Sequence, residues 1–257
     1  MDDIITIAPS TNAGATSQAP SAKLEFTVWR MFAWCGPIYM TVGLVAFAGI
    51  ARFLPPPQQN WGADHLAYWF SDNSTRVKIG MLGMLAIGFF YAAWSLAVAR
   101  LMERVEGPHR LLSRIQLLGG VGTALVTMGC AIPWFLAAFR PGSRTPSEIL
   151  LLSDMGWSIF DLTAMVTIVQ MLSFGLLWLL VPATSQLVPR WMSYFSLFIT
   201  TLQVPVYVWP WVTSGPFAWS GLIDYYLLLA AFFGWIAVVT YHLLRAIAQL
   251  ERSEMAL

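Results

Sequence analysis

The chain has 257 residues, of which 58% are hydrophobic and 11% are charged. Soluble domains carry about 25% charged residues, so this composition indicates a protein whose main solvent is lipid. The net charge of +1 argues against a nucleic-acid-binding protein, because such proteins present a strongly basic surface. Cys35 and Cys130 lie in separate apolar runs, which argues against a disulfide framework or a cysteine zinc site.

The N-terminal segment is polar and rich in Ser, Thr, Ala, Pro and Gly. Such a segment has too few large apolar residues to bury a core, so we predict a disordered cytoplasmic tail over residues 1–25. A signal peptide is not expected, because no basic region precedes the first long apolar run, which starts only after Arg30.

Six apolar segments of the sequence are each long enough to cross a bilayer, which takes about 20 residues of helix. We therefore predict an all-α, polytopic membrane bundle of six transmembrane helices within a domain over residues 26–250, followed by a short tail at 251–257. The predicted spans are residues 31–50, 77–99, 117–139, 161–181, 191–211 and 222–245.

The distribution of Lys and Arg between the connections predicts the orientation. With both termini inside, nine basic residues face the cytoplasm and five face outward. Cytoplasmic connections carry the excess of Lys and Arg in membrane proteins, so we predict an N-in, C-in topology. The Arg-rich connection RLMERVEGPHRLLSR between the second and third spans contributes most of this excess.

The predicted outer connections are longer and more aromatic than the inner ones. Two of them contain similar segments, LAYWFSDNST and EILLLSDMGW, in which an apolar-rich piece ends in Ser-Asp. This pattern predicts short interfacial helices in the outer loops. Prolines lie in the first, third and fifth spans, where kinks could splay the helices and open a vestibule.

The sequence lacks the motifs of the common classes of enzyme and cofactor protein. His65, His109 and His242 are spread over both sides of the predicted bilayer, so they cannot form a di-iron cluster or a bis-histidine haem site. Lys23 and Lys78 lie outside the slab or at its edge, which leaves no buried Schiff-base lysine. We therefore predict no cofactor, no metal and no catalytic residue, and the sequence favours a protein that is not an enzyme.

Ionisable residues within the predicted membrane are candidate functional residues, because charge there costs at least about 2.5 kcal/mol. Asp161 is the strongest candidate; the alternative interpretation is an ion pair with Arg140 or Arg144. Asp154 and Asp224 are also candidates, with helix capping as the alternative.

Polar amides within the spans and aromatic residues of the outer loops complete the candidate set. We interpret Gln170 and Gln203 as interhelical hydrogen-bond partners, with a pathway-lining role as the alternative. Aromatic side chains near the outer face could line a pocket for an apolar ligand. The predicted ligand-binding residues are Tyr68, Trp69, Asp154, Trp157, Asp161, Trp219, Asp224 and Tyr225.

The segments AYWFSDNSTRVKIG and SGPFAWSGL resemble a pattern found in uncharacterised multi-pass bacterial membrane proteins. The resemblance extends over residues 29–245. It implies a location in the bacterial inner membrane, and it implies no activity and no functional residues.

Two functions remain open from the sequence. The first is a membrane protein that binds or passes an apolar small molecule or lipid through an aromatic vestibule at the outer face. The alternative is a non-catalytic accessory or scaffold subunit of a larger membrane complex. The expected partners are the lipid bilayer, an apolar ligand, and partner membrane subunits or further copies of the chain, with no nucleic acid. A cofactor-free enzyme that uses outer-face carboxylates is a third, weaker hypothesis.

Overall fold

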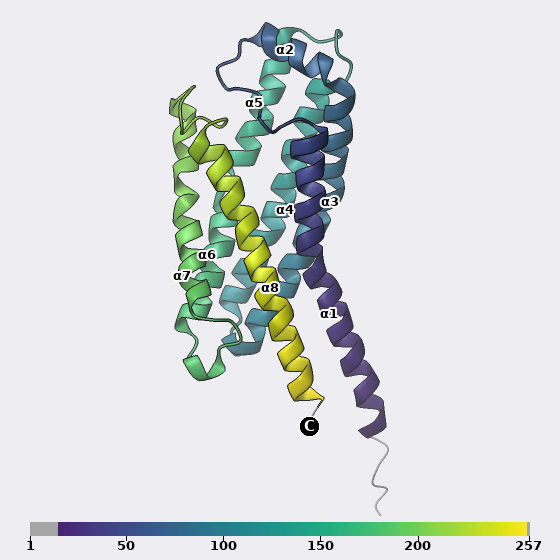
Figure 1. The fold of residues 1–257 in the computed structure, drawn as a ribbon, viewed down its shortest axis with the longest axis vertical. Coiled ribbons are helices and arrows are strands. Elements are labelled where there is room, and N and C mark those ends of the chain that lie inside the picture. The colour runs from purple at the N-terminus through teal and green to yellow at the C-terminus, as the bar shows by residue number, and fades with distance from the viewer. Residues whose placement is uncertain (1–14, 256–257) are drawn as a thin grey trace, which may run out of the picture.

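A computed structural model describes residues 15–255 of the chain, and the side chains from Lys23 onward. The regular elements within this part of the chain are all helices, and they form an upright bundle (Figure 1). Residues 1–14 of the predicted N-terminal tail and residues 256–257 of the C-terminal one lie outside the described residues. The elements are α1 (Ala15–Gly43), η1 (Leu44–Ile50), α2 (Ala63–Asp72), α3 (Ser74–Glu106), α4 (Leu111–Ala138), α5 (Pro146–Leu162), α6 (Met165–Leu180), η2 (Ala183–Ser185), α7 (Trp191–Leu202), η3 (Val204–Trp211), η4 (Leu222–Leu227) and α8 (Leu228–Glu254).

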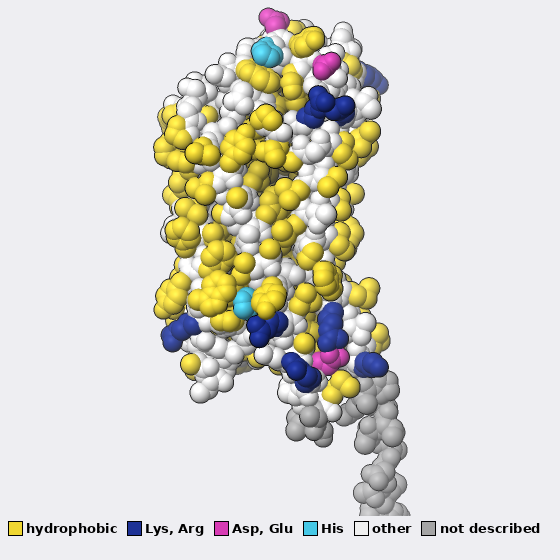
Figure 2. Space-filling model, viewed as in Figure 1, with side chains coloured by type: hydrophobic (Ala, Val, Ile, Leu, Met, Phe, Trp, Pro, Cys, Tyr) yellow, Lys and Arg dark blue, Asp and Glu magenta, His cyan; other side chains and the backbone are white. Residues whose placement is uncertain are grey.

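Five helical segments are long and apolar enough to cross a membrane. Apolar side chains cover the middle of the bundle, and the Lys and Arg side chains gather toward its ends (Figure 2). This distribution is typical of a multi-pass membrane protein, because lipid replaces water around the middle of the molecule. The five segments are Lys23–Ile50, Ser74–Glu106, Leu111–Ala138, Pro146–Leu180 and Leu222–Glu254.

The predicted span over residues 191–211 is not a continuous α-helix. It consists of α7, with 12 residues, followed by the 3₁₀ helix η3, with eight. Pro205 at the start of η3 has no N–H to donate, so the α-helical hydrogen-bond ladder ends there. Neither piece alone reaches the length of a span, and the count of six spans stays a prediction.

The segment EILLLSDMGW does not form a short interfacial helix. It belongs to α5, which packs along α4 and continues after a turn at Thr163 and Ala164 into α6. Pro146–Leu180 is therefore a single membrane-competent segment. Of the two predicted outer helices, only α2 is a short helix, and it lies across one end of the bundle (Figure 1).

The end of the bundle that holds the first turns of α1 and the last turns of α8 is rich in charge. All five ion pairs formed by the described residues lie there; four of them join α1, α3 and α8, and the fifth joins Arg110 at the start of α4 to Glu103 of α3. The guanidinium group of Arg100 also lies 5.3 Å from the ring centroid of Trp29. This end corresponds to the predicted cytoplasmic face; the N-in, C-in orientation stays a prediction.

Small residues and a polar network join α3, α4 and α6. A Cβ atom on Gly120 would overlap Ser95 of α3 and lie 2.9 Å from Gln170 Nε2 of α6, so only glycine permits this approach. Tyr91 donates a hydrogen bond of 2.8 Å to Gln170 Oε1, and Gln170 Nε2 donates one of 3.0 Å to Ser95. The interpretation of Gln170 as an interhelical hydrogen-bond partner is confirmed.

Candidate functional site

Aromatic side chains close the bundle beneath α2. We call this cluster the aromatic roof; its members are Phe53, Trp134, Trp157, Trp219 and Tyr225. The rings of Trp157 and Trp219 stack with centroids 5.5 Å apart, and Trp134 lies edge to face against Trp157 at 5.0 Å. All five side chains are buried. The roof is therefore a packed layer and not the open vestibule that the sequence suggested.

Hydrogen bonds attach the roof to the two loops that precede α2 and η4. Trp219 donates from its indole to Pro57 O and from its backbone N–H to Gln59 Oε1. The Gln59 side chain in turn donates to Val212 O at 2.8 Å. Tyr225 donates its hydroxyl hydrogen to Phe53 O. Of the predicted ligand-binding residues, Trp157, Trp219 and Tyr225 are thus brought together in this layer.

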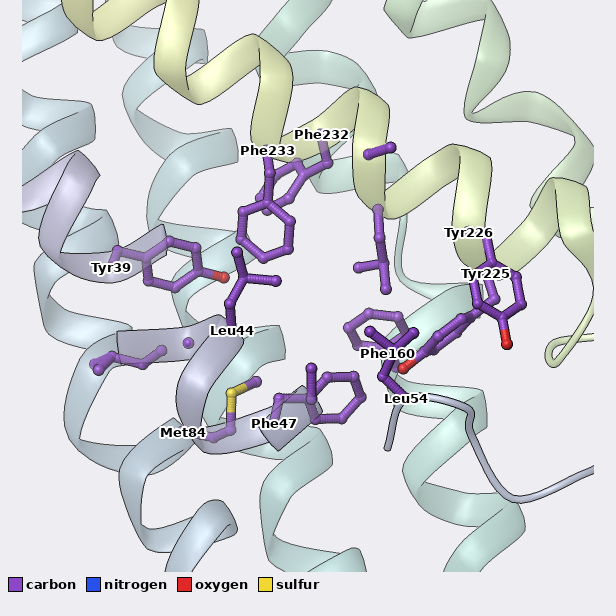
Figure 3. Close-up of a pocket in the computed structure, with 15 residues that line it drawn as sticks. Tyr39, Leu44, Phe47, Leu54, Met84, Phe160, Tyr225, Tyr226, Phe232 and Phe233 are labelled. Atoms are coloured by element: carbon purple, nitrogen blue, oxygen red, sulfur yellow. The ribbon is translucent and has the colours of Figure 1, made fainter. Parts of the chain in front are cut away.

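A cavity of about 330 Å³ lies beside the roof, between α1–η1, α3 and η4–α8. Figure 3 shows its side chains arranged around a common central space. Apart from three tyrosines, all the lining residues are apolar. We call it the larger cavity; its lining residues are Tyr39, Gly43, Leu44, Phe47, Ala48, Leu54, Met84, Ile87, Phe160, Tyr225, Tyr226, Leu229, Ala230, Phe232 and Phe233.

Irregular helix geometry forms two walls of the larger cavity. Both π-helical elements of the described chain, η1 and η4, contribute lining residues, including Phe47 and Tyr225. A π-helix widens the helix and shifts its side chains, and such segments are frequent at functional sites. The cavity therefore lies where the chain departs from the ideal α-helix.

The margin of the larger cavity reaches the side of the bundle. Its lining residues Leu44, Leu54 and Tyr226 are 43%, 51% and 37% exposed, although the neighbouring Phe47 and Tyr225 are buried. Leu44 belongs to η1 and Tyr226 to η4, so the exposed margin lies between these two elements. Leu44 and Tyr226 belong to two membrane-competent segments, and Leu54 belongs to the loop that follows η1.

A second cavity of about 80 Å³ lies next to the first and is more polar. We call it the smaller cavity. It is lined by Asp161 at the end of α5 and by Asp224 in η4. Gln203, the residue directly before η3, also lines it. Tyr39, Phe160, Leu229 and Phe232 line both cavities, so the two spaces are adjacent.

Neither carboxyl group of the smaller cavity has a partner among the described residues. Asp161 and Asp224 are each only 5% exposed, and Asp161 Oδ2 and both carboxyl oxygens of Asp224 lack any hydrogen bond. The alternative interpretations of these residues are wrong. Asp161 forms no ion pair with Arg140 or Arg144, and Asp224 caps no helix, since the side chain makes no capping bond at η4.

The position of Asp161 also differs from the prediction. The sequence placed it at the outer start of a span, but it lies near the middle of Pro146–Leu180, just before the turn at Thr163 and Ala164. Four interruptions of regular α-helix thus border the cavities: this turn, η1, η3 and η4.

The remaining predicted site residues lie outside both cavities. Tyr68 is 72% exposed on α2, and Trp69 packs edge to face against Phe53 of the roof with centroids 5.7 Å apart. Asp154 lies within α5, where it is partly exposed and caps no helix. His65 stacks on Trp61 at 4.3 Å.

The sequence interpretation missed most of the larger cavity. Phe47, Phe160, Phe232 and Phe233 lie in apolar runs, where nothing distinguishes a cavity-lining ring from one that faces lipid. Gln203 could have been recognised from the sequence as a lining residue, because it is a polar amide within a predicted span. Its alternative role as a lining residue matches its position in the smaller cavity, and its side chain makes no hydrogen bond to a described residue.

Comparison of the chain with protein-family models, curated proteins and solved structures gives no match. The site is therefore interpreted from its own geometry.

Proposed function

We propose that the protein binds an apolar small molecule or a lipid chain in the larger cavity, which the ligand enters sideways from the bilayer. The observation that carries this proposal is a space of about 330 Å³ with an almost entirely apolar lining and an exposed margin between η1 and η4. Small-molecule sites are typically pockets of roughly 300–1,000 Å³ with mostly apolar walls. A hydrocarbon chain in a space of this size would make dispersion contacts with the apolar walls.

The lateral entrance replaces the outer vestibule in this proposal. The aromatic roof is buried and closely packed through Trp157, Trp219 and Tyr225, and the loop residue that borders the larger cavity is Leu54. A hydrophobic ligand is concentrated in the bilayer, so an opening toward lipid offers it the shorter path. The setting we propose is the inner membrane of a bacterium, with the charged end of the bundle inside.

The experiment is a binding assay with tritiated decanol on the protein in lipid nanodiscs, after subtraction of the uptake by empty nanodiscs. Ala48 and Ala230 line the larger cavity, so Ala48→Phe and Ala230→Phe should fill it and weaken binding at least about tenfold, equivalent to about 1.4 kcal/mol. Ala237→Phe is the matched control, because Ala237 is an exposed residue of α8 that lines neither cavity.

Unchanged decanol binding in both filled variants would contradict the proposal. The accessory-subunit hypothesis would then be favoured if the protein also purified with stoichiometric partner chains from gentle detergent.

A further inference from the structure

The two buried aspartates of the smaller cavity lack a compensating positive charge. Transferring a single charged group into a membrane interior costs at least about 2.5 kcal/mol, and two such groups face one space here. Among the described residues, no Lys, Arg or His lines either cavity. The positive charge that balances this site must therefore come from outside the chain, as protons or as a bound cation.

A third polar side chain lines the same space. Gln203 is only 4% exposed, lines the smaller cavity and makes no side-chain hydrogen bond to a described residue. Buried polar groups without partners are rare, because each costs about 1–3 kcal/mol. By contrast, the nearby Thr123 and Thr167 hydroxyl groups satisfy each other at 2.9 Å. Among the residues that line the smaller cavity, Asp161 and Asp224 thus carry buried carboxyl oxygens without a hydrogen bond, and Gln203 adds a side-chain amide to the same lining.

The junction between the two cavities is apolar and aromatic. Tyr39, Phe160 and Phe232 line both spaces, and the rings of Tyr39 and Phe232 lie edge to face with centroids 6.5 Å apart. Aromatic rings attract cations through their negative faces. A molecule that extends through this junction would therefore meet apolar walls along its body and carboxylates at its tip.

We propose that the ligand of this protein is a lipophilic primary amine, with its hydrocarbon chain in the larger cavity and its ammonium group in the smaller one. An alkylammonium group offers three N–H donors, as the Lys side chain does. The three acceptors are a carboxylate oxygen from each aspartate and the Gln203 amide oxygen. The proposal rests on the proposed function, since it names the class of ligand that the larger cavity would take.

The same charges exclude other lipid head groups. A phosphate or carboxylate beside Asp161 and Asp224 would be repelled by each of these carboxylates that is ionised, and it could not supply the positive charge that the site lacks. The smaller cavity, with about 80 Å³, also lacks the room for a phospholipid head group. Amines without a phosphate fit this site, and fatty acids and phospholipids do not.

The test is competition against tritiated decylamine bound to the protein in lipid nanodiscs at pH 7, with corrections for uptake by empty nanodiscs. Decanol and decanoate have the same chain length and differ in the head group. The wild-type protein should bind decylamine at least about tenfold more tightly than decanol, and decanoate should not compete. Equal affinities for decylamine and decanol would overturn the inference and leave the proposed function intact, whereas no binding of either would overturn both.

Isosteric substitutions assign the effect to the aspartates. The double variant Asp161→Asn, Asp224→Asn should lose the preference for decylamine and retain decanol binding within about twofold, which also reports that it is folded. Glu148→Gln is the matched control, because Glu148 is an exposed carboxylate outside both cavities. A double variant that still prefers decylamine tenfold would contradict the assignment. If the double variant fails to fold, the relative affinities of the wild-type protein for decylamine, decanol and decanoate decide whether the ligand is an amine.

Discussion

The indole rings of Trp157 and Trp219 stack with centroids 5.5 Å apart and planes 9° from parallel. One ring comes from α5 and the other from the loop before η4, so this contact joins two distant parts of the chain. It also packs the space beneath α2, and for this reason the proposed function has the ligand enter from the side of the bundle.

Trp219→Ala should destabilise the protein by about 3–5 kcal/mol, because it removes a large buried ring from the aromatic roof. Trp211→Ala should change the stability by less than about 0.5 kcal/mol, since Trp211 is 81% exposed. The melting temperature of each variant is measured by thermal unfolding in detergent. A thiol-reactive dye reports unfolding, because it reacts with the buried Cys130 only once the protein unfolds; the partly exposed Cys35 is replaced by Ser in all samples. Equal melting temperatures for the two variants would argue against a packed roof.

Cysteine labelling tests whether residues 191–211 cross the membrane. Ser185 and Ser214 are exposed on either side of α7 and η3. In a variant without Cys35 and Cys130, a cysteine at 214 should react with a membrane-impermeant maleimide added to intact cells, and one at 185 should not. Labelling of both positions, or of neither, would contradict the six-span topology.

Close packing of α4 against α5 depends on Gly156. A Cβ atom at this position would overlap the indole ring of Trp134, so Gly156→Val should cost about 1–3 kcal/mol through overpacking. A Cβ atom on Gly234 of α8 would meet no neighbouring atom within 4 Å, so Gly234→Ala should be neutral or stabilising by up to about 1 kcal/mol. Thermal unfolding of the two variants in the same detergent compares them. A stable Gly156→Val variant would show that α5 does not pack as described.

The first turn of α5 is held by a capping box. Glu148 N–H donates to the Thr145 hydroxyl oxygen at 3.3 Å, and Thr145 N–H donates to Glu148 Oε2 at 2.7 Å. Thr145→Ala should therefore cost about 1 kcal/mol of stability, and Thr145→Ser much less. Chemical or thermal unfolding of the wild type, Thr145→Ser and Thr145→Ala should rank their stabilities in that order. Equal losses for both variants would contradict a hydroxyl cap.

The helical spans could be predicted from the sequence because lipid demands long apolar runs. Residues 77–99 and 117–139 were predicted, and the helices α3 and α4 include nearly all of both. Their ends could not be predicted, since a helix continues beyond the bilayer for as long as its backbone bonds are satisfied. The segment EILLLSDMGW was predicted to form a short interfacial helix, because Glu148 and Asp154 interrupt the apolar run; it belongs instead to the 17-residue helix α5, which packs against α4.

The candidate site could be predicted only as separate residues. Asp161 and Asp224 are recognisable because acids are rare within apolar segments. Their convergence on one cavity depends on how α5 packs against η4, and no local pattern encodes that contact. The π-helical geometry of η1 and η4 has no signature in residue type either, so the larger cavity became visible only in three dimensions.

The occupancy of the larger cavity tests the central claim most directly. The measurement is a structure of the wild-type protein determined in lipid, beside one of Ala230→Phe under the same conditions. We expect elongated non-protein density that passes between η1 and η4 and ends near Asp161 and Asp224 in the wild type, and its loss in the variant. A wild-type structure in which Phe47, Phe232 and Phe233 turn inward and fill the space would contradict the claim.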